Sequence, residues 1–175
     1  SVELMQEAQS FIQNKDFDSA ISAFTEAARL DPSNPDPTYF RGDAYKQKGD
    51  LENAIADYTR AIEIAPDYGD AYEARAFAYE DRGDLDRAIA DYTSAISTNG
   101  HAAYYYFRAN ALQKKGKLED AVADCSEAVR IWPKYGDAYR LRALVYQKKN
   151  DLERAITDCS EAIRVDPEDL FAYEL

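Results

Sequence analysis

The chain has 175 residues and carries 21 Lys and Arg against 33 Asp and Glu, a net charge of −12. So acidic a chain is a poor partner for a nucleic-acid backbone, and no apolar run is long enough to span a bilayer, so neither nucleic acid nor a membrane is an expected partner. The N-terminus lacks the basic and then apolar layout of a signal peptide; the location stays open, with the cytoplasm favoured.

One sequence unit recurs along the chain at steps of 34 residues, with one step of 33. Its columns hold a small residue, an aromatic residue or Leu, glycine, alanine, a second aromatic residue, a second alanine and proline. In the second copy these are Gly42, Tyr45, Gly49, Ala54, Tyr58, Ala61 and Pro66. We predict copies at residues 1–34, 35–68, 69–101, 102–135 and 136–169, and the start of a further or capping helix at 170–175.

Each copy is expected to form two helices joined by a tight turn. In the second copy the first helix spans Tyr39 to Lys48 and ends at Gly49, which can adopt the left-handed conformation that closes a helix. Asp50 then caps a second helix, and Pro66 prevents that helix from continuing. We therefore predict ten helices of about a dozen residues in five antiparallel pairs, no strand, and a partial eleventh helix from residue 168.

Taken in order, the copies depart from this pattern locally. The first has Lys15 in the glycine column, and the third ends one residue early at Asn99 and Gly100, which suit a left-handed cap. The fourth has Lys117 where other copies have a capping Asp, so its second helix should begin less firmly. The fifth has Asn150 in the glycine column, and asparagine tolerates the left-handed conformation better than other non-glycine residues.

The repeated pattern resembles the tetratricopeptide repeat family over nearly the whole chain. The resemblance implies an all-α fold, a right-handed α-solenoid of stacked antiparallel helix pairs whose first helices line a concave groove. It also implies that the groove binds a protein or a peptide.

A subset of that family clamps the acidic C-terminal tail of chaperones with Lys, Asn and Arg in these columns. This chain departs from the subset, with Asp70 and Asp137 in the lysine column, Ala74 and Leu141 in the arginine column, and Met5 and Gln9 at the opening lysine and asparagine. The departures argue against a chaperone tail as the ligand.

No catalytic residue, metal site or cofactor is expected. Cys125 and Cys159 share a column in successive copies about 10 Å apart, too far for a disulfide, so we predict buried, reduced packing residues. His101 is the only histidine, which excludes a histidine-pair metal site and a Ser-His-acid triad. Gly116 and Lys117 lack the other residues of a phosphate-binding loop.

Two charged columns recur together, always 16 residues apart. The first helices carry Arg41, Arg75, Arg108 and Arg142, and the second helices carry Asp57, Asp91, Asp124 and Asp158. The planar fork of arginine suits carboxylate pairing between packed helices. We favour this structural role over the alternative, a row of arginines that binds an acidic ligand, because both columns are absent together from the first copy.

The groove face follows from the helix period. If the small and aromatic columns pack inward, the opposite face of the first helices carries the candidate binding residues. They are Tyr39, Phe40, Asp43, Asp70, Glu73, Phe77, Glu80, Asp81, Tyr106, Phe107, Asn110, Lys114, Arg140, Leu141 and Leu144. Aromatic residues exposed on this face would mark an interaction site, whereas the alternative is that some of them fill space between neighbouring first helices.

Charge is distributed unevenly along the chain. Residues 1–101 hold 9 basic and 20 acidic side chains, a net of −11, whereas residues 102–175 hold 12 and 13, a net of −1. We therefore expect an apolar segment with basic character, its basic end over the second and third copies. The alternative is that the acidic residues serve solubility.

Three functional hypotheses follow. The first is a non-catalytic scaffold whose groove binds a peptide or helix of a partner protein. The second is a structural module that forms homo-oligomers end to end through its C-terminal helix. The third is the non-catalytic arm of a larger enzyme.

Overall fold

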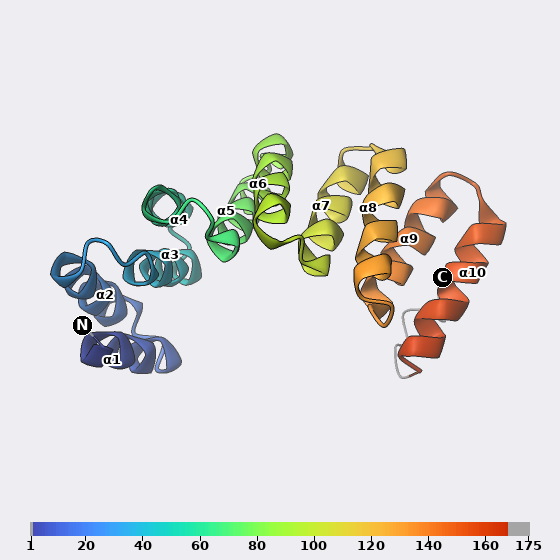
Figure 1. The fold of residues 1–175 in the computed structure, drawn as a ribbon. Helices are drawn as coiled ribbons and strands as arrows, with labels where there is room; N and C mark the ends of the chain where they lie inside the picture. The colour runs from blue at the N-terminus through green and yellow to red at the C-terminus, as the bar shows by residue number, and fades with distance from the viewer. Residues whose placement is uncertain (1, 168–175) are drawn as a thin grey trace. The chain divides into compact units, whose positions relative to one another are not determined.

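The computed structural model describes residues 2–167, which contain ten α-helices and no strand (Figure 1). The helices are α1 (Val2–Gln13), α2 (Phe17–Leu30), α3 (Asp36–Lys48), α4 (Leu51–Ile64), α5 (Gly69–Asp81), α6 (Leu85–Asn99), α7 (Ala102–Lys114), α8 (Leu118–Ile131), α9 (Gly136–Lys148) and α10 (Leu152–Val165). They are 12 to 15 residues long, and their succession confirms the predicted all-α fold. The partial eleventh helix predicted from residue 168 lies outside the described residues.

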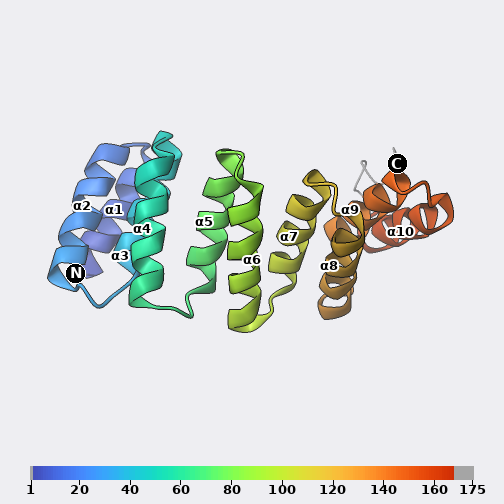
Figure 2. The same cartoon turned by 90° about the horizontal axis from the view of Figure 1, so that it is seen from above.

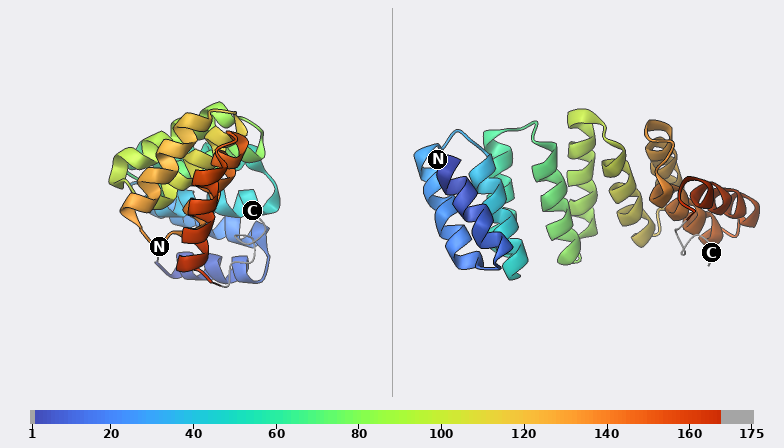
Figure 3. Two further views of the ribbon diagram at one scale, coloured as in Figure 1. Left: turned by 90° about the vertical axis from the view of Figure 1, so that its right-hand side faces the viewer. Right: turned by 90° about the horizontal axis from the view of Figure 1, so that it is seen from below.

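The chain divides into two compact units, Ser1–Thr98 and Asn99–Leu175. The first unit holds three antiparallel pairs, α1 to α6, and the second holds two, α7 to α10. Within each unit a second helix packs on its own first helix and on the first helix of the next pair, as α2 does on α1 and α3 (Figures 1 and 2). The right-hand view of Figure 3, seen from below, shows α1 and α2 side by side at the N-terminal end of the first unit.

The turns inside the pairs form as their residues predict. Gly49 has a φ of 87°, and Lys15 and Asn150 adopt the same left-handed conformation at 59° and 60°. Two copies therefore tolerate the strain of a side chain where glycine would have none. The Asp50 carboxylate accepts a hydrogen bond from the backbone N–H of Asn53 at 3.2 Å. No side chain caps the start of α8, where Lys117 stands, as predicted.

The first helix of the second copy begins earlier than predicted. α3 starts at Asp36 instead of Tyr39, and Pro35 and Pro37 lie at its N-terminal end. The N–H groups of a first helical turn have no partner within the helix, so proline loses nothing there and its fixed φ already suits the helix. Pro35 therefore stands at the N-cap of the helix, and Pro37 lies in its first turn.

The small columns make close packing between helices possible. The alanines of the second helices are almost completely buried, namely Ala20, Ala54, Ala88, Ala121, Ala155, Ala27, Ala61, Ala95, Ala128 and Ala162. Gly42 marks a close approach of α3 to α4, because a Cβ atom there would lie 2.7 Å from the ring of Tyr58 and 3.3 Å from the carbonyl oxygen of Ala54. Only glycine lets α3 approach α4 at this point.

The cysteines are both free, and only one is fully buried. Cys125 is buried, which raises the pKa of its thiol to about 12, so it is an unreactive packing residue. Cys159 is only partly buried, which corrects the expectation that both would be. Its helix, α10, is the last described helix, and among residues 2–167 no next pair covers it. None of the described helices is long and apolar enough to cross a membrane.

Candidate functional site

The predicted Arg–Asp ladder is present in all four copies that carry it. In each, Nε and Nη2 of the arginine donate to the two carboxylate oxygens of the aspartate at 2.6 to 2.8 Å; the pairs are Arg41–Asp57, Arg75–Asp91, Arg108–Asp124 and Arg142–Asp158. The aspartates are only 3 to 7% exposed. The arginines therefore neutralise buried carboxylates, which supports the structural role over a ligand-binding one.

The same arginines also connect neighbouring pairs, a role that we did not predict. Nη1 of Arg41 donates to the Thr25 hydroxyl on α2 at 3.0 Å, and Nη1 of Arg142 donates to the Ser126 hydroxyl on α8 at 3.0 Å. The signal was available, because a hydroxyl residue stands 16 positions before each of these arginines. Arg41, Arg75 and Arg142 thus each join their own pair to the preceding second helix.

A second row of ion pairs spans the same interfaces. A basic residue at or just after the end of a first helix meets an acid in the first turn of the preceding second helix, 30 positions earlier. Lys48 Nζ lies 2.5 Å from Asp18 and Lys149 Nζ lies 2.9 Å from Glu119. These pairs are exposed and contribute little to stability, but they mark which face of a first helix packs on the preceding pair.

The aromatic residues of the predicted groove are partly buried, not exposed as expected. Tyr39 packs on Phe40, Tyr58 and Tyr68, with ring centroids 5.1, 5.8 and 5.1 Å away. Phe77 packs edge-on against a buried tyrosine of α6 at 5.8 Å. Tyr39 therefore packs on its own helix, on the second helix of its pair and on the turn before α5.

The acidic residues of the first unit fall into two groups. Asp70 and Asp81 are exposed, whereas Asp43, Glu73 and Glu80 are partly buried. Buried tyrosines donate to two of the latter: the Tyr58 hydroxyl lies 2.7 Å from Asp43, and the Tyr92 hydroxyl lies 2.8 Å from Glu80.

Burial raises the pKa of two of these carboxylates. It raises the pKa of Asp43 above its ordinary value, and the Tyr58 hydrogen bond only partly opposes it. Burial, with a smaller contribution from the charge of Asp70, raises the pKa of Glu73 to about 7. Lys46 lowers both values in part, from a position 5.1 Å above the Phe77 ring. Sequence reasoning missed Lys46, which is the basic residue of this acidic face.

A cavity of about 240 Å³ lies between the first two pairs of the first unit. Its apolar lining comes from Ile12, Phe24 and Phe40, and its polar lining from Gln9, Gln13, Asp43 and Gln47. Phe40 and Asp43 were predicted site residues. Gln9 and Gln13 on α1 were not, although they occupy the same columns as Asp43 and Gln47, 34 positions later.

In the second unit the predicted residues form a less acidic face. Tyr106 is partly buried, and its ring lies 5.3 Å from Phe107 and 5.2 Å from Tyr135. Arg140 donates to Asp137 on the same helix at 2.5 Å. Of the remaining residues, Leu141 is buried, Asn110 and Leu144 are partly buried, and Lys114 is exposed. Leu141 therefore belongs to the core and offers little surface to a ligand.

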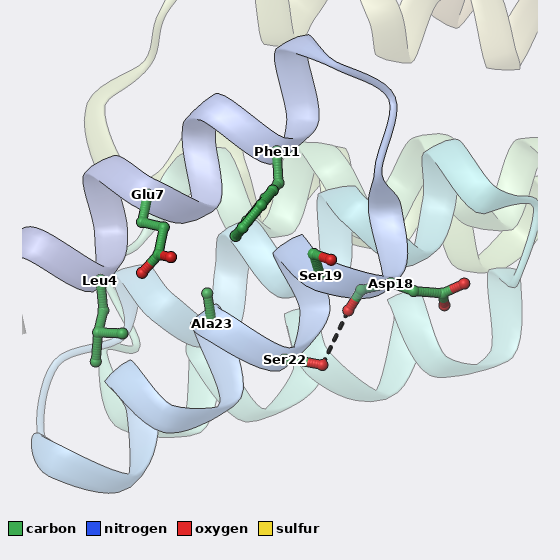
Figure 4. Close-up of a pocket in the computed structure, with 7 residues that line it drawn as sticks. All are labelled: Leu4, Glu7, Phe11, Asp18, Ser19, Ser22 and Ala23. Carbon is green, nitrogen blue, oxygen red and sulfur yellow. Dashed lines mark hydrogen bonds between the residues drawn. The ribbon is translucent and has the colours of Figure 1, made fainter.

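An open hollow of about 440 Å³ lies between α1 and α2, at the N-terminal end of the first unit. Figure 4 shows Glu7 pointing from α1 toward Ala23 on α2, with Leu4 and Phe11 on either side along α1. Glu7 and Ala23 occupy the columns of the ladder arginine and aspartate. The first copy thus has a space where the other copies have an ion pair.

The repeat unit and its packing match a known family. Models described as tetratricopeptide repeat match residues 5–69, 73–136 and 136–169. The chain belongs to the tetratricopeptide repeat (TPR) family. No curated protein sequence matches this TPR protein significantly.

Several solved structures have the same fold as this TPR protein. MamA is 23% identical over 99% of this chain and 95% of its own, with a TM-score of 0.83. A TPR protein from Parabacteroides merdae ATCC 43184 is 22% identical over 98% of this chain and 69% of its own, with a TM-score of 0.85. YrrB, a TPR protein with an unusual peptide-binding site, is 19% identical over 98% and 89%, with a TM-score of 0.79. At these identities the likeness shows the fold alone.

The described part of this TPR protein holds no cluster of His, Cys, Asp and Glu that could bind a metal ion. His101 has a structural role, because it caps α7 by accepting the backbone N–H of Ala103 at its Nδ1 atom, 3.3 Å away.

Proposed function

We propose that this TPR protein is a non-catalytic interaction scaffold whose first unit binds a segment of a partner protein. The binding face is formed by the first helices α1, α3 and α5, and the segment combines apolar side chains with a basic one. The TPR fold supports a role in protein interaction, and YrrB, which has the same fold, has a peptide-binding site. Tyr106, Phe107 and Asn110 are proposed to offer a second, less acidic contact face.

The observation that supports a basic ligand is the state of Asp43 and Glu73. Neither forms an ion pair within 4.0 Å among the described residues, and burial raises the pKa of both. A partly desolvated carboxylate without a cation is unfavourable, and a basic side chain from a ligand would offset that penalty. Lys46 provides only part of this compensation.

The cavity beside Asp43 suits one long side chain. Its 240 Å³ is below the roughly 300 Å³ at which pockets for drug-sized ligands begin, but it exceeds the ~30 Å³ of a water molecule several times. Ile12 and Phe40 can cover the methylene groups of a Lys or Arg while Asp43 meets its charged end. The glutamine amides at the rim can hydrogen-bond a peptide backbone.

The proposal is tested by selecting peptides from a random library displayed on phage, with the full chain as bait. We expect peptides with a Lys or Arg next to apolar residues. The variant Asp43→Asn with Glu73→Gln should lose them, since it removes two charges and keeps the shapes. The matched control, Glu3→Gln with Asp67→Asn, removes two exposed charges and should keep them. Selection of peptides without basic residues, or equal binding to both variants, would refute the proposal.

Self-association is a second candidate, favoured by one observation. Leu152 and Ile156 on α10 are 56% and 67% exposed, although residues in the same columns of the other copies are partly buried. An apolar face of this kind is typical of an interface. A sedimentation experiment decides: mass that rises with concentration, and falls again with Leu152→Glu, would support a homo-oligomer.

A further inference from the structure

The hollow at the N-terminal end of the first unit lies on a face that is covered in the equivalent helices. On α3 this face packs against α2, through Arg41 to Thr25 and Lys48 to Asp18. On α9 it packs against α8 in the same way. No described helix packs on this face of α1, which leaves the hollow of about 440 Å³ open.

The residues of the hollow lack the charge balance of the covered interfaces. In those interfaces a long arginine reaches a short hydroxyl side chain, and a buried aspartate balances its charge. Here Glu7 replaces the arginine and Ala23 replaces the aspartate. Glu7 forms no hydrogen bond or ion pair with any other residue in the range 2–167. Asp18 also lines the hollow but pairs with Lys48, so Glu7 is the one carboxylate of the hollow without a described ion pair, whereas the charges of the covered interfaces are balanced.

We infer that this hollow binds a helix of a partner protein, which lies along α1 as α2 lies along α3 and presents a Lys or Arg to Glu7. The lengths fit, because a short glutamate facing a long basic residue spans the same gap as a long arginine facing a threonine. The charges fit as well, because the basic residue makes the site neutral. Leu4 and Phe11 provide the apolar contacts on either side.

A second copy of this chain does not meet these requirements. The last described helix, α10, has Ser160 in the column that would face Glu7, so it brings no cation there. Glu153 of α10 would face Asn14, which directly follows α1 and carries no charge. Head-to-tail stacking of two copies would therefore leave Glu7 without a cation and would form no ion pair at either position.

A stapled helix tests the inference directly. The probe has the sequence of residues 51–64, which already packs on a first helix, with a hydrocarbon staple between the exposed positions of Ala56 and Arg60. The staple is needed because a helix of this length is marginal alone in water. One probe carries Lys at the position of Thr59 and another carries Glu, and binding of each to the full chain is measured by fluorescence anisotropy.

We expect the Lys probe to bind about tenfold more tightly than the Glu probe. The chain variant Glu7→Lys should invert this preference, whereas the matched control Glu3→Lys, on the same helix but outside the hollow, should leave it unchanged. Ala23→Leu should fill the hollow and weaken both probes. Equal binding of the two probes, or a preference that survives Glu7→Lys, would overturn the inference. So would a dimer of the full chain that Glu7→Lys dissociates, because the occupant would then be a second copy.

Discussion

Removal of the ladder arginine Arg75 tests how the pairs are held together. Its side chain is 15% exposed, and Arg75→Ala leaves Asp91, whose side chain is 9% exposed, without its two charge-assisted hydrogen bonds at 2.8 Å. Such bonds contribute about 1.5 to 3 kcal/mol each, and water entering the space left by the arginine recovers part of that. We expect a loss of about 2 to 4 kcal/mol in the free energy of unfolding.

The measurement is urea unfolding followed by circular dichroism, with two comparisons. Arg60→Ala removes an arginine from a pair whose side chains are 59% and 58% exposed, and should change stability by less than about 0.5 kcal/mol. Arg75→Met with Asp91→Leu removes both charges and should recover at least half of the loss, because no buried charge remains. If Arg75→Ala proves as mild as Arg60→Ala, the ladder does not hold the pairs together and the arginine row is free for a ligand.

Three further predictions concern single residues. Because the pKa of Glu73 is raised to about 7 in the folded state, its contribution favours folding below pH 4.5 and is lost as the pH rises through 7. Glu73→Gln should therefore be neutral at pH 4.5 and, after allowance for its partial exposure, stabilise the protein by about 1 kcal/mol at pH 8; equal urea midpoints at both pH values would contradict this. Gly42→Ala should destabilise the protein by about 1 to 3 kcal/mol, since its Cβ would lie 2.7 Å from a tyrosine ring of α4. The control Gly136→Ala has its nearest contact at 3.4 Å and should be close to neutral; thermal unfolding of the two variants measures the difference. Lys117→Asp should supply the missing cap of α8 and stabilise the protein by about 1 kcal/mol. Lys134→Asp makes the same charge change in an exposed turn and should not stabilise it. Hydrogen exchange of the first turn of α8 distinguishes the two variants.

The fold could be predicted from the sequence because each helix pair repeats the same local instructions. Gly49 and Asp50 end one helix and begin the next, and both act in the structure as they do in isolated helices. The ladder was predictable because every arginine of the first helices is followed 16 residues later by an aspartate of the second helix, as Arg75 is by Asp91. Where a copy departs, as at Lys117, the consequence was local and therefore also predictable.

The candidate site was less predictable, since it depends on distances between helices. The helix period placed Tyr39 on the outer face of α3, but only the packing of neighbouring helices shows that three aromatic rings surround it. The raised pKa of Glu73 likewise depends on its burial, which only the packing of the helices shows. Gln9 and Gln13 were missed because the first copy departs from the repeat pattern in other columns, although both residues lie in the columns of Asp43 and Gln47.

The hollow beside Glu7 illustrates a different limit. The sequence showed that Glu7 and Ala23 replace the ladder residues, but an absent ion pair does not by itself indicate a cavity. The structure adds that the two small or short side chains leave about 440 Å³ between α1 and α2. A substitution in a repeat column therefore gains meaning only when the packing around it is known.

The most direct test of the central claim is the association rate of a library-selected peptide with the full chain, measured by stopped flow at several salt concentrations. If the acidic face of the first unit attracts a basic segment, Asp43→Asn with Glu73→Gln should slow association and make it less dependent on salt, while Phe77→Ala should mainly speed dissociation. An association rate and a salt dependence that are unchanged in the double variant would contradict the claim and leave the acidic face a solvated surface.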